Sequence, residues 1–408
     1  MTAREYPVFT VTPKAERSLR AGHPWVYGEE VTAVEGAYQN GDMVDVVSNK
    51  GRYLGTGWVN DHSKIRVRII SRNANDTFDE AFFRRRVCYA LNYRKTVMGE
   101  TDYRCCRLIF GEADQFPGLT VDRFENILVT QVLSLGMERR KDWVYRALVE
   151  LLREDGEQID AIYERNDVTI RTLEGLEQGK GFYQMEGLKT DLSGHVTITE
   201  NRIKYDVDYM EGQKTGFFLD QKYNRQAAAK LARGRRVLDC FTHTGAFALN
   251  AAAAGAEHVT AVDVSAFALE LAAENGKCNG LTNLDYKCAD VFDLLTGMAK
   301  EKKCDYDYII LDPPAFTKSR ATAKNAYHGY KEINMKAMRL LPRGGYLATC
   351  SCSHFMTDEM FRKMLQEAAL DAGVTLRQIE ARQQAPDHPI LPEVPETDYL
   401  KFYLLQVV

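Results

Sequence analysis

The sequence predicts an α/β protein in which a doubly wound, Rossmann-like sheet follows a small β-barrel and a mixed α+β segment. Short strands joined by turns fill the first part of the chain, and helical and strand patterns mix in the middle. From about residue 195, strands alternate with Ala/Leu-rich helices, which is typical of a parallel sheet. We therefore expect three domains, at residues 1–75, 76–192 and 193–408.

The barrel and the middle domain are predicted from patterned runs. Alternating hydrophobicity and turn signals indicate strands in the barrel at DMVDVVS, RYLGTGWV and KIRVRII. The middle domain is expected to open with the helix EAFFRRRVCYALNYRKTV. Its strands are YRCCRLIF, GLTVDRF, NILVTQVL and AIYERN, with a further helix at RKDWVYRALVELL. Cys105 and Cys106 point to opposite faces of a strand, so we expect core residues rather than joint ligands.

Composition narrows the class of protein. A chain of 408 residues with 45% hydrophobic and 27% charged residues is typical of a globular protein. The start, MTAREYPVFT, lacks the apolar core of a signal peptide, and no run reaches the roughly 18 apolar residues of a membrane span. We expect a cytoplasmic protein without a membrane partner. Nine irregularly spaced cysteines in a reducing compartment argue against a disulfide framework.

The N-terminal part is mildly basic. Residues 1–110 carry 17 Lys and Arg against 13 Asp and Glu, whereas the remainder carries 36 against 44. A short helix places Lys14 and Arg17 on one side, close to Trp25 in the sequence. Basic side chains beside an aromatic ring suit a nucleic-acid backbone and an exposed base. The alternative is a solvated helix with a core tryptophan.

The strand ends of the last domain carry acids that indicate a cofactor. VLDCFTHTGAFALNAAAAGA is a strand, a turn and a helix, but it lacks the G-x-G-x-x-G of dinucleotide sites. S-adenosylmethionine, which has no phosphate, fits this pattern instead. Asp239 is expected to hold its ammonium group and Asp263 its ribose hydroxyls, while Gly245 opens the turn between them. Asp290 in CADVF is expected to meet the adenine amino group. Helix-capping aspartates are the alternative for each acid alone. The remaining expected cofactor contacts are Gln221, Phe241, Thr244, Ser265 and Asp312.

Two motifs indicate what is methylated. In DPPAF (312–316), two prolines hold a rigid loop, Phe316 can stack on a flat substrate, and Asp312 can engage a polar ring edge. In TCSCS, Cys352 lies at the carboxyl end of a strand. Carbon 5 of a pyrimidine becomes nucleophilic only after a thiolate adds to carbon 6, and Cys352 is the expected catalytic nucleophile, with Asp312 beside it. Structural cysteines and a metal site are alternatives, but zinc needs more ligands than TCSCS offers, and we expect no metal.

DPPAF alone leaves an amino-nitrogen methyltransferase acting on guanine or adenine open. A third hypothesis is an RNA-binding ribosome assembly factor with a vestigial cofactor site. Lys331 in GYKEIN is expected to meet phosphate, although a lone lysine is more often a surface residue. QAPDHP is either a loop over the substrate or a structural turn.

The chain resembles the bacterial large-subunit (23S) ribosomal RNA cytosine-5 methyltransferases with an N-terminal PUA domain. The resemblance spans essentially the whole chain and rests on HPWVY, GEADQFPGLTVDRF, KTGFFLDQ, FTHTGAFA, DPPAF, GYKEINMKAM, SCSHFM and QAPDHP. It implies PUA, mixed α+β and class I methyltransferase domains, S-adenosyl-L-methionine as cofactor, ribosomal RNA as partner, and a homodimer. It maps the catalytic cysteine onto Cys352 and supports a cofactor role for Gln221. The family commonly has an apolar residue at position 350, so Cys350 is expected in the core. Other cytosine-5 methyltransferases carry a second cysteine after the proline that follows the fourth strand. Here Pro314 is followed by Ala315, so the group that removes the carbon 5 proton is open.

Overall fold

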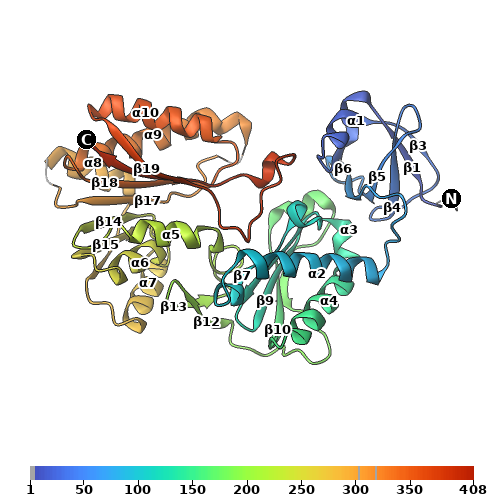
Figure 1. Cartoon of the computed structure of the whole chain (residues 1–408), viewed down its shortest axis with the longest axis horizontal. Coiled ribbons are helices and arrows are strands. Elements are labelled where there is room, and N and C mark those ends of the chain that lie inside the picture. The colour runs from blue at the N-terminus through green and yellow to red at the C-terminus, as the bar shows by residue number, and fades with distance from the viewer. Residues whose placement is uncertain (1–4, 302–303, 318) are drawn as a thin grey trace. The chain divides into compact units, whose positions relative to one another are not determined.

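The computed structural model describes residues 5–301, 304–317 and 319–408. The chain forms two compact units, which are described separately (Figure 1). The first comprises Met1–Thr197, Val207–Leu219 and Pro386–Thr397; the second comprises Ile198–Asp206, Asp220–Ala385 and Asp398–Val408. Within the described ranges, no helix combines the length and the apolar character that crossing a bilayer requires.

The first unit begins with a six-stranded, mainly antiparallel sheet in the order β2-β6-β5-β4-β1-β3. Its strands are β1 (Val8–Val11), β2 (Trp25–Tyr27), β3 (Val31–Glu35), β4 (Met43–Ser48), β5 (Tyr53–Val59) and β6 (Ile65–Ser71). The helix α1 (Pro13–Arg20) begins at Thr12, whose side chain accepts from the Ala15 amide. Leu19 of this helix packs into the apolar cluster of the sheet. The three strands predicted here are confirmed as β4, β5 and β6.

A second sheet in this unit has five strands in the order β11-β10-β9-β8-β7. They are β7 (Cys105–Phe110), β8 (Leu119–Phe124), β9 (Ile127–Val132), β10 (Ala161–Asn166) and β11 (Gly179–Phe182). The helices here are α2 (Glu80–Val97), α3 (Leu135–Glu138) and α4 (Lys141–Glu154). Ion pairs tie α2 to α4, from Arg84 to Glu150 at 3.1 Å and from Arg146 to Glu80 at 2.9 Å. Cys105 and Cys106 are both fully buried, as predicted.

Within the QAPDHP segment, the residues from Pro386 onward belong to the first unit. Asp387 is fully buried and its carboxylate accepts from the Arg107 amide at 2.8 Å, while its carbonyl accepts from Arg94 at 2.8 Å. His388 hydrogen-bonds the Asp387 carboxylate at 2.9 Å and its ring packs on Phe110. These contacts give the segment a structural role beside β7. The two strands β12 (His195–Glu200) and β13 (Ile203–Asp208) form a separate pair.

The second unit is built on a seven-stranded sheet in the order β16-β15-β14-β17-β18-β20-β19. Its strands are β14 (Arg236–Cys240), β15 (His258–Asp263), β16 (Leu284–Cys288), β17 (Tyr308–Leu311), β18 (Tyr346–Ser351), β19 (Leu376–Arg382) and β20 (Lys401–Val407). The first five of these pair in parallel, which confirms the predicted alternation. The parallel prediction is incomplete, because β20 runs antiparallel to both β18 and β19. The antiparallel strand β20 is second from the edge, between β18 and β19, so the sheet is mixed, as large α/β sheets commonly are.

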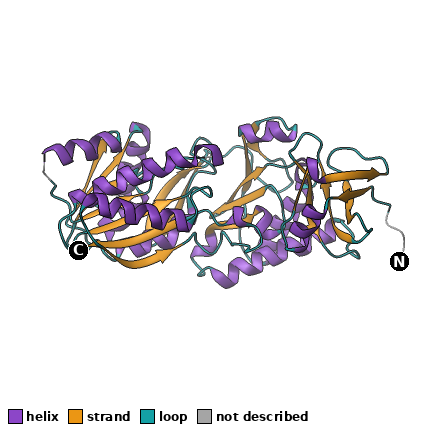
Figure 2. Ribbon diagram, turned by 90° about the horizontal axis from the view of Figure 1, so that it is seen from above, coloured by secondary structure: helices purple, strands orange, loops and turns teal. Residues whose placement is uncertain are grey.

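Helices cover both faces of this sheet (Figures 1 and 2). One face carries α8 (Val291–Glu301), α9 (Ala323–Leu340) and α10 (Asp358–Ala372), whose apolar side chains form one core cluster with the strands. The other face carries α5 (Lys222–Ala229), α6 (Ala246–Ala253) and α7 (Ala266–Cys278). The strand order reverses at β14, with β15 on one side and β17 on the other. Ligands of open α/β sheets bind beyond the carboxyl ends of the strands at such a reversal.

Candidate active site

The turn after β14 has an unusual backbone. Phe241, His243 and Gly245 have φ values of 62°, 51° and 84°, in the left-handed region. A Cβ at Gly245 would lie 2.6 Å from Leu249 Cδ1 and 2.9 Å from Ala272 Cβ. Conformation and helix packing therefore both require the glycine. Non-glycine residues in the left-handed region cluster at ligand sites, which marks the turn from Phe241 to Gly245 as functional.

Asp239, at the end of β14, is fully buried beneath this turn. Its Oδ2 accepts from the Thr242 hydroxyl at 2.5 Å. Its Oδ1 is buried without a hydrogen-bond partner in the described part of the chain. Burial raises the pKa of this carboxyl to about 7. An unsatisfied buried acceptor fits a cationic group such as the ammonium of an amino-acid moiety. Thr244, expected beside it, is also buried.

Asp263, at the end of β15, is held by backbone amides. Its oxygens accept from the amides of His243 at 2.9 Å and Ser265 at 3.0 Å. The Ser265 hydroxyl accepts from the Ala268 amide and caps α7. Val264 and Phe267 beside it are 62% and 60% exposed. This arrangement suits an adenosine, because the fixed carboxylate can accept hydrogen bonds from the ribose hydroxyls and the exposed apolar side chains can pack on the adenine ring.

Asp290 shows the alternative that the sequence left open. Its Oδ1 accepts from the Asp293 amide at 3.1 Å, at the start of α8. This is the geometry of a helix N-cap. The side chain is exposed at the end of the strand next to β15. A contact with adenine therefore stays a prediction.

Asp312 follows β17 and has several polar neighbours. Its Oδ1 accepts from the side-chain amide (Nε2) of Gln221 at 3.1 Å, and Gln221 Oε1 accepts from the side-chain amide of Asn224 at 2.7 Å. Burial raises the pKa of Asp312 to about 6, although the Arg225 guanidinium opposes the shift. Cys350 on β18 is fully buried, and burial together with the Asp312 charge raises its thiol pKa. Cys350 thus lies in the core, as expected.

Cys352 lies just beyond β18 and is partly exposed. Its Sγ is 3.9 Å from the Pro313 carbonyl oxygen, so the thiol lies against the DPPAF loop. The hydroxyl of Ser353 donates to the Thr317 carbonyl at 3.0 Å. The two motifs that the sequence singled out, DPPAF and SCS, therefore meet at adjacent strand ends.

Phe316 packs in an aromatic cluster. Its ring centroid lies 4.5 Å from that of Tyr330 and 5.8 Å from that of Phe292. The side chain is partly exposed. Part of the ring is thus taken up by the protein, and stacking on a substrate base stays a prediction.

Lys401, at the start of β20, was missed by sequence reasoning. It is buried, and its Nζ donates to the carbonyls of Ser353 at 2.6 Å and Tyr399 at 2.8 Å. Burial lowers its pKa to about 8, while the charges of Asp398 and Cys352 act in the opposite direction. In the sequence, the one sign of a special role is a lysine at the start of the otherwise apolar run KFYLL. Only the strand pairing, which puts Ser351 opposite Lys401, shows that this lysine lies beside the Cys352 segment.

The residues expected to bind RNA are placed as follows. Lys331 on α9 forms ion pairs with Asp371 at 2.9 Å and Glu367 at 3.6 Å on α10. The other three, Lys14, Arg17 and Trp25, belong to the first unit. Lys14 lies 3.2 Å from Glu30, Arg17 is exposed, and the Trp25 indole donates to Glu112 at 3.0 Å.

A Rossmann-like sheet with acids and a left-handed turn at its carboxyl edge defines a class I methyltransferase. Residues 182–405 match the family described as S-adenosylmethionine-dependent methyltransferase, and residues 9–72 match a PUA-like domain. The solved structure of SMU.776 complexed with SAH has a TM-score of 0.82 at 21% identity, covering 98% of this chain and all of its own. That likeness supports the fold.

Two relatives narrow the family. "Ribosomal RNA large subunit methyltransferase I" of Pseudoalteromonas atlantica is 40% identical over 98% of this chain and 99% of its own length. The protein of the same name from Shewanella amazonensis is 43% identical over 97% and 98%. The chain belongs to the S-adenosylmethionine-dependent methyltransferase family and, within it, to the group of these relatives. Its cofactor is S-adenosylmethionine.

Proposed function

We propose that the protein methylates carbon 5 of a cytosine in large-subunit ribosomal RNA through a covalent adduct at Cys352. The names of the relatives support ribosomal RNA as substrate. The observation that carries the cytosine assignment is the partly exposed thiol at the carboxyl end of β18, with Sγ 3.9 Å from the DPPAF carbonyl of Pro313. A methyltransferase acting on an amino nitrogen needs no thiol at this point.

Asp239 would hold the ammonium group of S-adenosylmethionine through its unsatisfied Oδ1, and Asp263 would hold the ribose hydroxyls. Gln221, Phe241, Thr244, Gly245, Ser265, Asp290 and Asp312 complete the proposed cofactor site. When bound, the cofactor supplies the methyl group that carbon 5 takes up.

The protein residues act on the cytosine ring. The Cys352 thiolate adds to carbon 6 while protonated Asp312 donates to N3, which makes carbon 5 an enamine-like nucleophile. With a pKa of about 6, a fraction of the Asp312 carboxyl groups is protonated near neutral pH, whereas an ordinary aspartate is almost fully ionised there. After methylation, a solvent water molecule takes the carbon 5 proton, the electron pair of that C–H bond forms the carbon 5–carbon 6 double bond, and the carbon 6–sulfur bond breaks to release the thiolate. The N3 proton returns to Asp312.

Lys401 is proposed as a positioning residue for Cys352. Its ammonium fixes the Ser353 carbonyl, one residue after the nucleophile, at 2.6 Å. A buried positive charge so close to the loop also favours the thiolate, because thiolates form where cations lie nearby. Proton loss above a pKa of about 8 would remove that help.

RNA containing 5-fluorocytosine tests the proposal. Fluorine cannot leave as a proton, so elimination stalls and the protein should remain covalently attached on a denaturing gel. Cys350→Ala is the matched control, since its thiol is fully buried. We expect an S-adenosylmethionine-dependent adduct with the wild type and Cys350→Ala, and none with Cys352→Ala. An adduct retained in Cys352→Ala but lost in Cys350→Ala would reverse the assignment.

The same gel tests Lys401. Lys401→Met should slow adduct formation about tenfold near neutral pH, because a thiol without a nearby cation forms less thiolate. The rate should recover at higher pH, and Lys401→Arg should restore most of it. A pH-independent loss would indicate a purely structural role.

Turnover by Cys352→Ala on RNA would instead favour the amino-nitrogen methyltransferase. Tight cofactor and RNA binding without turnover by the wild type would favour the assembly factor. Phe316, Lys331, Lys14, Arg17 and Trp25 remain proposed RNA contacts, and the homodimer and the cytoplasmic location remain predictions.

A further inference from the structure

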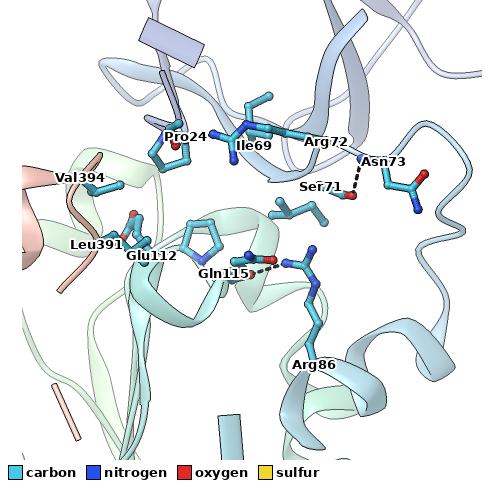
Figure 3. A pocket seen from close by; sticks show the side chains of 13 residues that line it. Pro24, Ile69, Ser71, Arg72, Asn73, Arg86, Glu112, Gln115, Leu391 and Val394 are labelled. Atoms are coloured by element: carbon cyan, nitrogen blue, oxygen red, sulfur yellow. Dashed lines mark hydrogen bonds between the residues drawn. The ribbon is translucent and has the colours of Figure 1, made fainter. Parts of the chain in front are cut away.

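A cavity of about 250 Å³ lies within the first unit, and none of its lining residues belongs to the proposed active site (Figure 3). Its walls come from five separate stretches of sequence. These are the connection from α1 to β2, the end of β6 with the residues after it, Arg86 on α2, residues 112–117, and the segment around Leu391 and Val394. Pockets for drug-sized ligands measure about 300–1,000 Å³, so this one suits a smaller group.

Two arginines with few partners line the cavity. Arg86 donates to the Gln115 carbonyl at 3.0 Å (Figure 3). Its guanidinium lies 4.4 Å from the Phe82 ring centroid. Arg72 donates to the Gly22 carbonyl. Burial lowers the pKa of both, that of Arg86 to about 10. Among the described residues, neither has a carboxylate within ion-pair distance, although the charges of Glu393 and Asp76 act on them from farther away.

Neighbouring arginines differ from these two. On the same helix as Arg86, Arg84 pairs with Glu150 and Glu154, and Arg94 pairs with Asp114. A guanidinium has five N–H donors in a fork that matches phosphate oxygens. Most donors of Arg72 and Arg86 are therefore not matched by an anion.

The other walls suit a flat apolar group. Pro24, Ile69 and Pro117 supply apolar surface, with Leu391 and Val394 beside them. Glu112 is the one carboxylate among the lining residues of the described chain, and it is engaged: Oε1 accepts from the Trp25 indole at 3.0 Å and lies 3.6 Å from Arg68. The cavity thus combines apolar walls with unpaired positive charge.

We propose that this cavity binds one nucleotide of the substrate RNA, with its phosphate on Arg72 and Arg86 and its base against the proline-lined wall. The inference rests on the proposed RNA substrate. Single-stranded RNA is recognised by basic side chains on phosphate together with apolar or aromatic contacts to the base. The flat apolar wall beside two arginines favours a nucleotide, which has a ring and a phosphate, over an acidic peptide, and the basic character of the first 110 residues favours a negatively charged partner.

The test is the salt dependence of RNA binding by the full chain. The probe is a fluorescein-labelled single-stranded RNA of 12 nucleotides, followed by anisotropy. Arg72→Gln/Arg86→Gln should weaken binding about tenfold or more, and should reduce the slope of log K against log salt by about 0.7 for one lost phosphate contact. The control is Arg84→Gln/Arg146→Gln, which removes the same charge from ion-paired arginines. It should weaken binding less than threefold with an unchanged slope.

Other outcomes overturn the inference. Equal loss in both double variants would mean that only net charge matters, and no loss in either would mean that RNA does not use the cavity. Cytidine monophosphate that binds through Arg86 while RNA affinity stays unchanged would indicate a free-nucleotide site. Cofactor affinity, measured by calorimetry, should be the same in all variants. Because binding is read without turnover, failure of the Cys352 adduct leaves this test intact. A wild type that binds no RNA would defeat the substrate assignment and this inference together.

Discussion

The inner strand ends of the catalytic sheet differ from the outer ones. At β14 and β17, Asp239 is fully buried and Asp312 is partly buried, and burial raises their carboxyl pKa values to about 7 and about 6. At β15 and β16, Asp263 and Asp290 instead accept backbone amides next to the helices that follow. All four look alike in the sequence, as acids that end strands. The inner pair can therefore exchange protons near neutral pH, whereas the outer pair is held in place by backbone amides.

The largest effect expected from this division is at Asp312. Asp312→Asn cannot deliver a proton to N3, so the single-turnover methylation rate should fall about 10²–10⁴-fold, the usual contribution of general acid–base catalysis. In the wild type, the protonated fraction falls tenfold per pH unit above a pKa of about 6. The wild-type rate should therefore fall as pH rises above about 6, and this decrease should be absent in Asp312→Asn.

Single-turnover rates from pH 5 to 8 at saturating cofactor measure both effects. Asp263→Asn is the matched control from the outer pair, and its rate should fall with rising pH as in the wild type. An Asp312→Asn protein with more than half of the wild-type rate would show that proton donation by Asp312 does not contribute to catalysis.

The intermediate effect concerns Asp239 and the cofactor. If the ionised carboxylate holds the ammonium group, then binding must release a proton below a pKa of about 7. The affinity for S-adenosylmethionine should therefore fall up to tenfold per unit as pH drops below 7. Asp239→Asn should weaken binding about 10–100-fold at pH 7.5, the range of a hydrogen bond to a charged group, and should abolish the pH dependence.

Calorimetry from pH 5.5 to 7.5 supplies the measurement. Asp263→Asn should weaken binding at every pH by a constant factor and keep the slope. A wild-type affinity independent of pH would contradict the proposed role of Asp239.

The sequence predicted which strand ends carry the candidate site, but not the electrostatics of the residues there. The five parallel strands, and the place of Cys352 beyond β18, followed from hydrophobic runs and chain order, which are local signals. Lys401 could not be found in this way, because its partner Ser353 is 48 residues away and is reached through antiparallel pairing of β18 with β20. The unpaired state of Arg86 was equally hidden. Its neighbours Arg84 and Arg85 look the same in RRR, and only the folded helix shows which of them meet carboxylates.

The smallest effect expected is at Asp290, where capping and cofactor binding can be separated. Serine caps a helix about as well as aspartate, so the free energy of unfolding of Asp290→Ser should stay within about 1 kcal/mol of the wild type. The serine side chain is, however, too short to reach an adenine amino group. The S-adenosylmethionine affinity of the variant should fall about fivefold, the value of one hydrogen bond. The inosine analogue of the cofactor lacks the amino group, and the wild type and Asp290→Ser should bind it equally. If Asp290→Ser binds both cofactors as the wild type does, the adenine contact is wrong and Asp290 only begins α8, which its bond to the Asp293 amide already explains.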